Sequence, residues 1–91
     1  MPYIKPADRL GLDEHINALA NAITTMSKDT YAFAGLLNYS CTRLALKVNP
    51  ARRYWTIALI TGVFKNIADE FYRRYGVPYE DEQIQKNGDV Y

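Results

Sequence analysis

Apolar side chains recur along most of this chain at alternating three- and four-residue steps, the spacing of one face of an α-helix. The first such series is Leu12, Ile16, Leu19, Ile23 and Met26. Pro6 and Asp8 are helix start signals ahead of it. The pattern therefore predicts a first helix over about residues 8–26.

The second apolar series is Phe33, Leu37, Ser40 or Cys41, Leu44 and Val48. Ser27, Asp29 and Thr30 each offer a side-chain oxygen for the N-cap of this helix. We expect the helix over about residues 30–48. Gly35 leaves open a later start, because glycine weakens a helix interior.

The third series is the longest and most apolar: Ile57, Ile60, Phe64, Ile67 and Phe71, widened by Tyr54, Trp55, Leu59 and Val63. Asn49 and Pro50 suit a cap and a first helical position, so the helix is expected from about residue 50 to residue 75. Gly76 and Pro78 are stop signals after it. Gly62 indicates either a close approach by another helix or a tolerated surface glycine.

The C-terminal residues 71–91 hold four tyrosines, two adjacent arginines and an acidic triplet. We expect a short helical turn over residues 79–86, ended by Asn87-Gly88, with Asp89–Tyr91 extended. A segment left in water has no use for so many rings, so residues 76–91 are predicted to dock on helical surface. The predicted fold is one all-α domain, residues 1–91, with three main helices, a long third helix and a docked tail.

Composition and cysteine content narrow the class of protein. The chain has 91 residues, 48% of them hydrophobic, and no apolar run approaches the roughly 20 residues of a membrane span. The N-terminus shows no apolar segment of a secretion signal, and the single Cys41 cannot form an intrachain disulfide. We therefore expect a cytoplasmic protein with no membrane partner.

Charge is distributed unevenly although the net charge is only +1. Residues 1–42 carry a net charge of −1, residues 43–74 carry +5, and residues 75–91 carry −3. The acidic tail can neutralise the basic middle, whereas a general nucleic-acid binder usually leaves its basic face open. The pattern argues against nucleic acid as the partner.

Catalytic signals are weak. His15 is the single histidine and has no nucleophile at a usable spacing, and the sequence has no Gly-rich phosphate loop and no Cys/His cluster. Asp69 and Glu70 have the spacing for helical ion pairs with the following arginines, and residues 80–82 resemble a solvated or capping cluster. The sequence therefore predicts no enzyme, no metal site and no cofactor.

Arginines beside aromatic residues are the better candidates for binding. The predicted ligand-binding residues are Arg52, Arg53, Tyr72, Arg73, Arg74 and Tyr79. Guanidinium groups bind phosphate in a bidentate manner and aromatic rings stack on bases, although arginines at a helix C-terminus also simply favour the helix dipole. The two arginine pairs lie about 30 Å apart along one helix, so only antiparallel association of two subunits would bring them together.

The motifs MPYIKPADR, LLNYSCTRL and EFYRRYGVPYEDEQIQKNGDVY resemble a family of small proteins of tailed phages, prophages and environmental microbes. The likeness covers most of the chain and is strongest at both termini. It departs between Thr24 and Gly35, where this chain is longer and more aromatic. The family has no assigned activity, so the resemblance implies an origin and no catalytic residues.

Together these patterns suggest a non-enzymatic, homo-oligomeric binding protein. In this hypothesis it sequesters a nucleotide-like signalling molecule or blocks a host defence protein. The alternative is a structural or adaptor protein whose aromatic surface is only an assembly interface. An enzyme ranks third, because it would need an acid, a base or a metal supplied across subunits.

Overall fold

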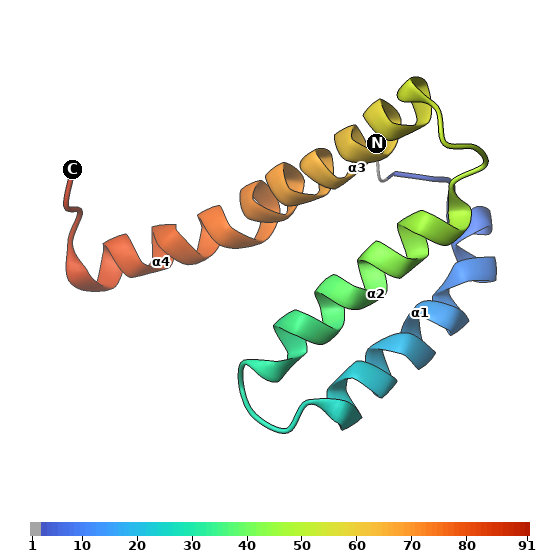
Figure 1. Ribbon diagram of the computed structural model, residues 1–91. Coiled ribbons are helices and arrows are strands. Elements are labelled where there is room, and N and C mark those ends of the chain that lie inside the picture. Colours follow the sequence, from blue (N-terminus) through green and yellow to red (C-terminus); the bar gives the residue numbers. More distant parts are fainter. Residues whose placement is uncertain (1–2) are drawn as a thin grey trace. The chain divides into compact units, whose positions relative to one another are not determined.

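The computed structural model describes residues 3–91, which form helices joined by short loops and contain no strand (Figure 1). The helical elements are α1 (Pro6–Met26), α2 (Ala32–Val48), α3 (Tyr54–Phe71), a π-helical segment η1 (Tyr72–Gly76) and α4 (Val77–Asn87). Because α3, η1 and α4 follow one another without a break, they make one long helix over residues 54–87. The predicted all-α class, with three helices of which the third is long, is confirmed.

The chain divides into two units, each described by itself. In the hairpin unit, up to Arg52, α1 and α2 lie side by side and run antiparallel (Figure 1). In the long-helix unit, from Arg53 to Tyr91, the main contacts join α3 with η1 and η1 with α4. The hairpin unit therefore has two helices that face each other, whereas the long helix meets no second helix within its own unit.

Local hydrogen bonds explain where α1 and α2 begin. Pro6 takes the first turn of α1, two residues earlier than expected, because that position needs no backbone N–H. The Asp29 carboxylate accepts hydrogen bonds from the N–H groups of Tyr31 and Ala32, both at 2.9 Å. These bonds fix the start of α2 at Ala32. The helix therefore begins before Gly35, and not at the later start that Gly35 left open.

The expected start of the third helix at Pro50 is wrong. The Asn49 side chain accepts a hydrogen bond from the Ala51 N–H at 3.3 Å, so it closes a turn after α2 and does not cap α3. The Thr56 hydroxyl accepts from the Arg53 N–H at 3.1 Å and donates to the Arg53 carbonyl at 2.8 Å. These bonds place the start of α3 at Tyr54, with Arg53 as the N-cap.

The expected helix stop at Gly76 is also wrong. The Val77 N–H bonds to the Tyr72 carbonyl, an i to i−5 bond that widens the helix by one residue just before Pro78. A proline in a regular α-helix clashes with the carbonyl four residues earlier, and the wider turn accommodates it. Gly76 itself has ordinary helical angles, φ −74° and ψ −47°. Helix therefore continues from α3 into α4.

The C-terminal boundary follows the prediction. α4 ends at Asn87, and Gly88 has a φ of +85°, a conformation that glycine adopts without strain. The Gly88 N–H bonds to the Ile84 carbonyl at 2.9 Å, and residues 89–91 are not helical. Tyr91 is fully exposed, so the docking of the tail on helical surface, of its own chain or of a neighbouring subunit, stays a prediction.

No large apolar side chain of residues 3–91 is buried, which is the main departure from the expected core. The only buried residue among them is Thr56, at 2% exposure. The apolar faces predicted from the sequence exist, and within the long-helix unit no second helix covers the apolar face of α3.

Candidate functional site

The ion pair expected near the end of α3 is present. Arg73 Nε donates to the Glu70 carboxylate at 2.7 Å, and the two residues are three apart on the helix. The Glu70 side chain is 26% exposed and that of Arg73 is 64% exposed. A surface pair of this kind contributes little to stability, but it turns the Arg73 guanidinium back along α3.

Arg74 and Tyr79 of the predicted ligand set line the same open hollow, of about 310 Å³. Tyr75, Pro78 and Glu82 complete its walls. All five residues lie on one side of the η1–α4 segment, since they follow one another at steps of one, three or four positions. The hollow thus offers one guanidinium and two aromatic rings, together with one carboxylate that would repel a phosphate.

Sequence reasoning missed Pro78 and Glu82 as neighbours of Arg74, and it placed Tyr75 beside Arg74 without including it among the ligand residues. Pro78 lies four residues after Arg74, and Tyr79 four residues after Tyr75, but this spacing places them on one side only if the helix runs through Gly76. Gly76 and Pro78 were read as a stop, so the two sides of the hollow were assigned to different elements. The π-helical segment is what joins them, and such segments are frequent at functional sites.

Tyr72 has a packing role in this structure. A Cβ added at Gly76 would lie 2.8 Å from Tyr72 Cδ2, so the Tyr72 ring covers the glycine. On the next helical row the rings of Phe71 and Tyr75 stack with centroids 5.2 Å apart. The aromatic residues of η1 therefore brace the π-helical turn, and Tyr75 is held in place at the rim of the hollow.

Arg52 and Arg53 do not join this group along the chain. Arg52 belongs to the hairpin unit, and Arg53 is the N-cap of α3 in the long-helix unit. Arg53 lies about 30 Å from Arg73, because some 20 helical residues separate them. Within one long-helix unit the two ends of α3 cannot contact the same small ligand.

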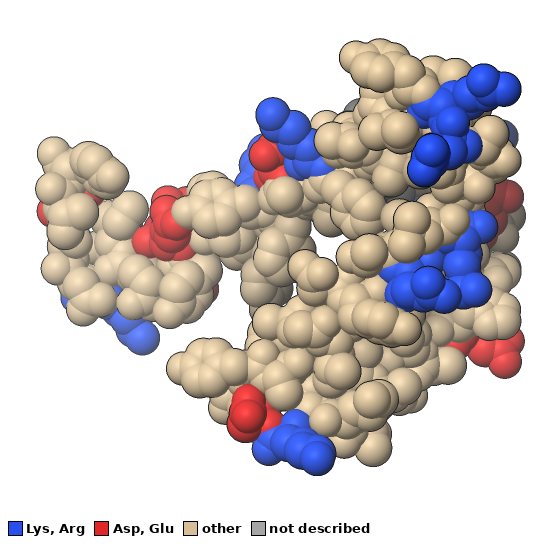
Figure 2. All heavy atoms as spheres, in the orientation of Figure 1, with Lys and Arg blue, Asp and Glu red and all other residues tan. Residues whose placement is uncertain are grey.

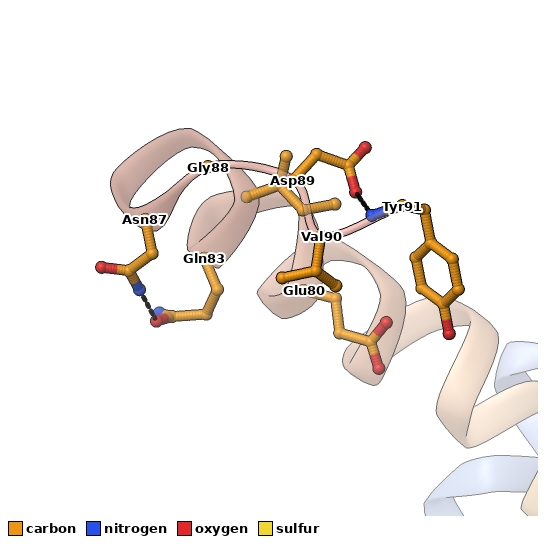
Figure 3. A pocket seen from close by; sticks show the side chains of 8 residues that line it. Glu80, Gln83, Asn87, Gly88, Asp89, Val90 and Tyr91 are labelled. Atoms are coloured by element: carbon orange, nitrogen blue, oxygen red, sulfur yellow. Dashed lines mark hydrogen bonds between the residues drawn. The ribbon is translucent and has the colours of Figure 1, made fainter.

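A second hollow of about 310 Å³ lies at the end of α4. After Gly88 the chain turns back beside the helix, and Val90 and Tyr91 lie next to Glu80 (Figure 3). Asn87 Nδ2 donates to Gln83 Oε1 at 3.3 Å, and the Tyr91 N–H donates to the Asp89 carboxylate at 2.9 Å (Figure 3). The Asn87-Gly88 signal predicted the turn but not the hollow.

Exposed apolar side chains form the largest potential binding surface. Uncharged side chains make up most of the visible face of the α1–α2 hairpin (Figure 2). On α3, Ile57, Ile67 and Phe71 are each more than half exposed. An exposed apolar face of this kind is a candidate interaction surface.

The described residues offer few features of other kinds of site. Between residues 3 and 91 no three His, Cys, Asp or Glu side chains gather in a way that could hold a metal ion. His15 lies exposed on α1, and Cys41 is half-buried as a free thiol on α2. None of the described helices combines the length and the apolarity needed to cross a membrane.

Comparison with known proteins gives a family. No curated protein and no solved structure matches the chain. One family model matches residues 1–90, and it is described as a domain of unknown function. This match is consistent with the resemblance to a family without an assigned activity. The chain therefore belongs to the family Domain of unknown function (DUF6899).

Proposed function

We propose that this protein is a non-enzymatic binding protein that works as a homo-oligomer and captures a nucleotide-like anion at a boundary between subunits. The observation that carries the proposal is the exposure of apolar side chains on α1, α2 and α3. A chain that leaves this much apolar surface in water gains free energy by covering it, and a second copy is always available.

The anion part of the proposal is supported by the hollow of Arg74 and Tyr79. A guanidinium binds phosphate oxygens, and a tyrosine ring stacks on a base. Glu82 in the same hollow opposes an anion, so the site needs more positive charge than one chain offers there. Arg52 and Arg53 of a neighbouring subunit would supply it.

The source of the ligand follows from the terminal motifs that resemble phage and prophage proteins. A phage-encoded protein of this kind would capture a signalling nucleotide of the host cell, or would block a host defence protein directly. In both cases the protein acts by binding and not by turnover.

Thermal unfolding with a nucleotide panel tests the anion part. Mononucleotides, cyclic dinucleotides and inorganic phosphate are added to the wild-type protein, to Arg74→Ala and to Lys86→Ala. Lys86 is the matched control, because it is a cation of α4 outside the Arg74–Tyr79 hollow. A ligand at a hundred times its Kd stabilises the protein by about 2.7 kcal/mol, which raises the Tm by several degrees.

We expect a shift with at least one nucleotide that Arg74→Ala removes and Lys86→Ala retains. An absence of any shift in the wild-type protein would reject the anion part. The adaptor function then remains, and it is favoured by the open shape of the hollow and by the extent of the exposed apolar surface.

A further inference from the structure

The apolar seam of α3 is uncovered within its own unit. We define this seam as Ile57, Ile60, Phe64, Ile67 and Phe71, which recur at steps of three and four residues. Four of these side chains are between 39% and 63% exposed. Their spacing is that of the a and d positions of a helix pair, where a second helix covers the seam.

The flanks of the seam are uncharged along most of α3. Thr56 and Val63 lie along one edge, and Thr61 and Ala68 lie along the other. Small or apolar flanks let a second helix approach closely, and they widen the contact beyond the seam itself. The polar side chains Lys65, Asn66 and Asp69 lie toward the opposite face, at 100° per residue.

We infer that the seam of α3 is covered by α3 of a second copy, running antiparallel about a two-fold axis level with residue 62. This inference rests on the homo-oligomer of the proposed function and names its interface. Residues whose numbers sum to 124 then face each other. Ile57 faces Ile67 of the second copy, and Ile60 faces Phe64, so every seam position meets an apolar partner until the ends.

Charge at the two ends of α3 selects the antiparallel orientation. Arg53 lies on the line of the seam one turn before Ile57, and in the antiparallel pair it faces Phe71 and comes beside Glu70 of the second copy. A parallel pair would place Arg53 beside Arg53 and Glu70 beside Glu70, which is unfavourable. Glu70 already binds Arg73, so it would lie between one arginine of each subunit.

The length of the seam suits this interface. It runs along the 18 residues of α3, about 27 Å of helix, and a standard interface removes about 800 Å² from each partner. The pairing also brings Arg52 and Arg53 of one subunit to the end of α3 that carries Arg73 and Arg74 of the other. The extra cations that the anion hollow needs are then supplied at the same boundary.

Disulfide trapping between differently marked copies tests the orientation. Ile57→Cys and Ile67→Cys are made as two separate variants in a Cys41→Ser background. Each variant is oxidised alone and in a mixture with the other, and the crosslinked dimer is identified by its mass. In the antiparallel pair, residue 57 lies about 15 Å along the axis from residue 57 of the second copy, and the same separation holds for residue 67. A disulfide cannot span that distance, so each variant alone stays uncrosslinked. The mixture should give at least ten times more crosslinked dimer than either variant alone.

The matched control is a mixture of Leu59→Cys and Lys65→Cys, whose numbers also sum to 124 but which lie away from the seam. We expect no crosslink there. Equal crosslinking of the control mixture, or crosslinking of Ile57→Cys alone, overturns the antiparallel seam. An uncrosslinked mixture that still sediments as an oligomer also overturns it and leaves the proposed homo-oligomer standing, whereas a monomer overturns both.

Charge reversal gives a second test that adds no cysteine. Arg53→Glu and Glu70→Arg should each raise the dissociation constant of the dimer at least threefold, because each creates a like-charged contact. The double variant restores an opposite pair between subunits and should return the constant to within twofold of wild type. If the double variant weakens the dimer by the sum of the two single effects, the antiparallel contact is contradicted.

Discussion

The hairpin unit and the long-helix unit differ in whether a second helix of the same unit lies against their helices. In the hairpin, α1 lies beside α2, which has five half-buried residues at steps of four, apart from one adjacent pair: Ala32, Leu36, Ser40, Cys41 and Ala45. In the long-helix unit, α3 carries the most apolar seam of the chain and meets only its own continuation. An isolated helix is marginal in water, so the long helix depends on contacts outside its unit more than the hairpin does.

Truncation on the seam of α3 should give the largest effect. Ile67→Ala and Leu59→Ala remove similar side chains that are 52% and 61% exposed in the single chain. If a partner covers the seam, Ile67→Ala costs about 3 kcal/mol, as for a buried aliphatic residue, and Leu59→Ala costs less than about 0.5 kcal/mol. Urea unfolding at one protein concentration measures both.

If both substitutions lower the free energy of unfolding by the same small amount, α3 depends on a partner no more than the hairpin does. The seam would then be ordinary surface. Repeating the Ile67→Ala measurement at higher protein concentration sharpens the result, because the stability of an assembled protein rises with concentration.

The two glycines of the long helix should respond with opposite signs. A Cβ at Gly76 would lie 2.8 Å from the Tyr72 ring, whereas a Cβ at Gly62 would meet nothing within 4 Å. Gly62→Ala should stabilise the protein by about 1 kcal/mol through helix propensity, because Gly62 faces away from the proposed partner. Gly76→Ala should destabilise it by about 1 kcal/mol through overlap with the ring.

Thermal unfolding of the two glycine variants checks these signs. The double variant Gly76→Ala with Tyr72→Ala is the control, since removing the ring removes the overlap. A destabilising Gly62→Ala would indicate that another helix approaches this face and would count against the assigned seam.

The smallest expected effect concerns the hairpin. Asp29→Ala removes the carboxylate that accepts from Tyr31 and Ala32, and loss of such a cap costs about 1 kcal/mol. Amide hydrogen exchange in the first turn of α2 should become about fivefold faster, while α3 is unaffected. Asp13→Ala on α1 is the control, and equal acceleration in both variants would contradict the assigned cap.

Much of the fold could be predicted from the sequence because its signals are local. The apolar spacing located all three helices, and Asn87-Gly88 marked the end of α4. Of the candidate N-caps of α2, Asp29 accepts hydrogen bonds from Tyr31 and Ala32, although the N-cap itself is Tyr31. The start of α3 was missed because Asn49 uses its side chain on Ala51, while the Thr56 hydroxyl binds Arg53 and fixes the start of the helix at Tyr54. Two good signals compete there, and the sequence does not rank them.

The candidate site was less predictable than the fold. Arg74 and Tyr79, both predicted as ligand residues, line one hollow, and their role in binding stays a prediction. Pro78 lies between them, and from the sequence it indicates a helix break. Proline is compatible with a helix when the preceding turn widens, and nothing in residue propensities reports that turn. The exposure of the α3 seam could not be predicted either. The spacing of apolar residues along a helix is the same whether the covering helix belongs to the same chain or to another one.

The mass of the particle in solution tests most directly whether a second copy covers the seam of α3. Sedimentation equilibrium of the wild-type protein should give an even multiple of 10.4 kDa, because a two-fold pair is the unit of assembly. Ile67→Ala should lower that mass at the same concentration. A single species of 10.4 kDa, unchanged in mass and melting temperature by Ile67→Ala, would contradict the claim.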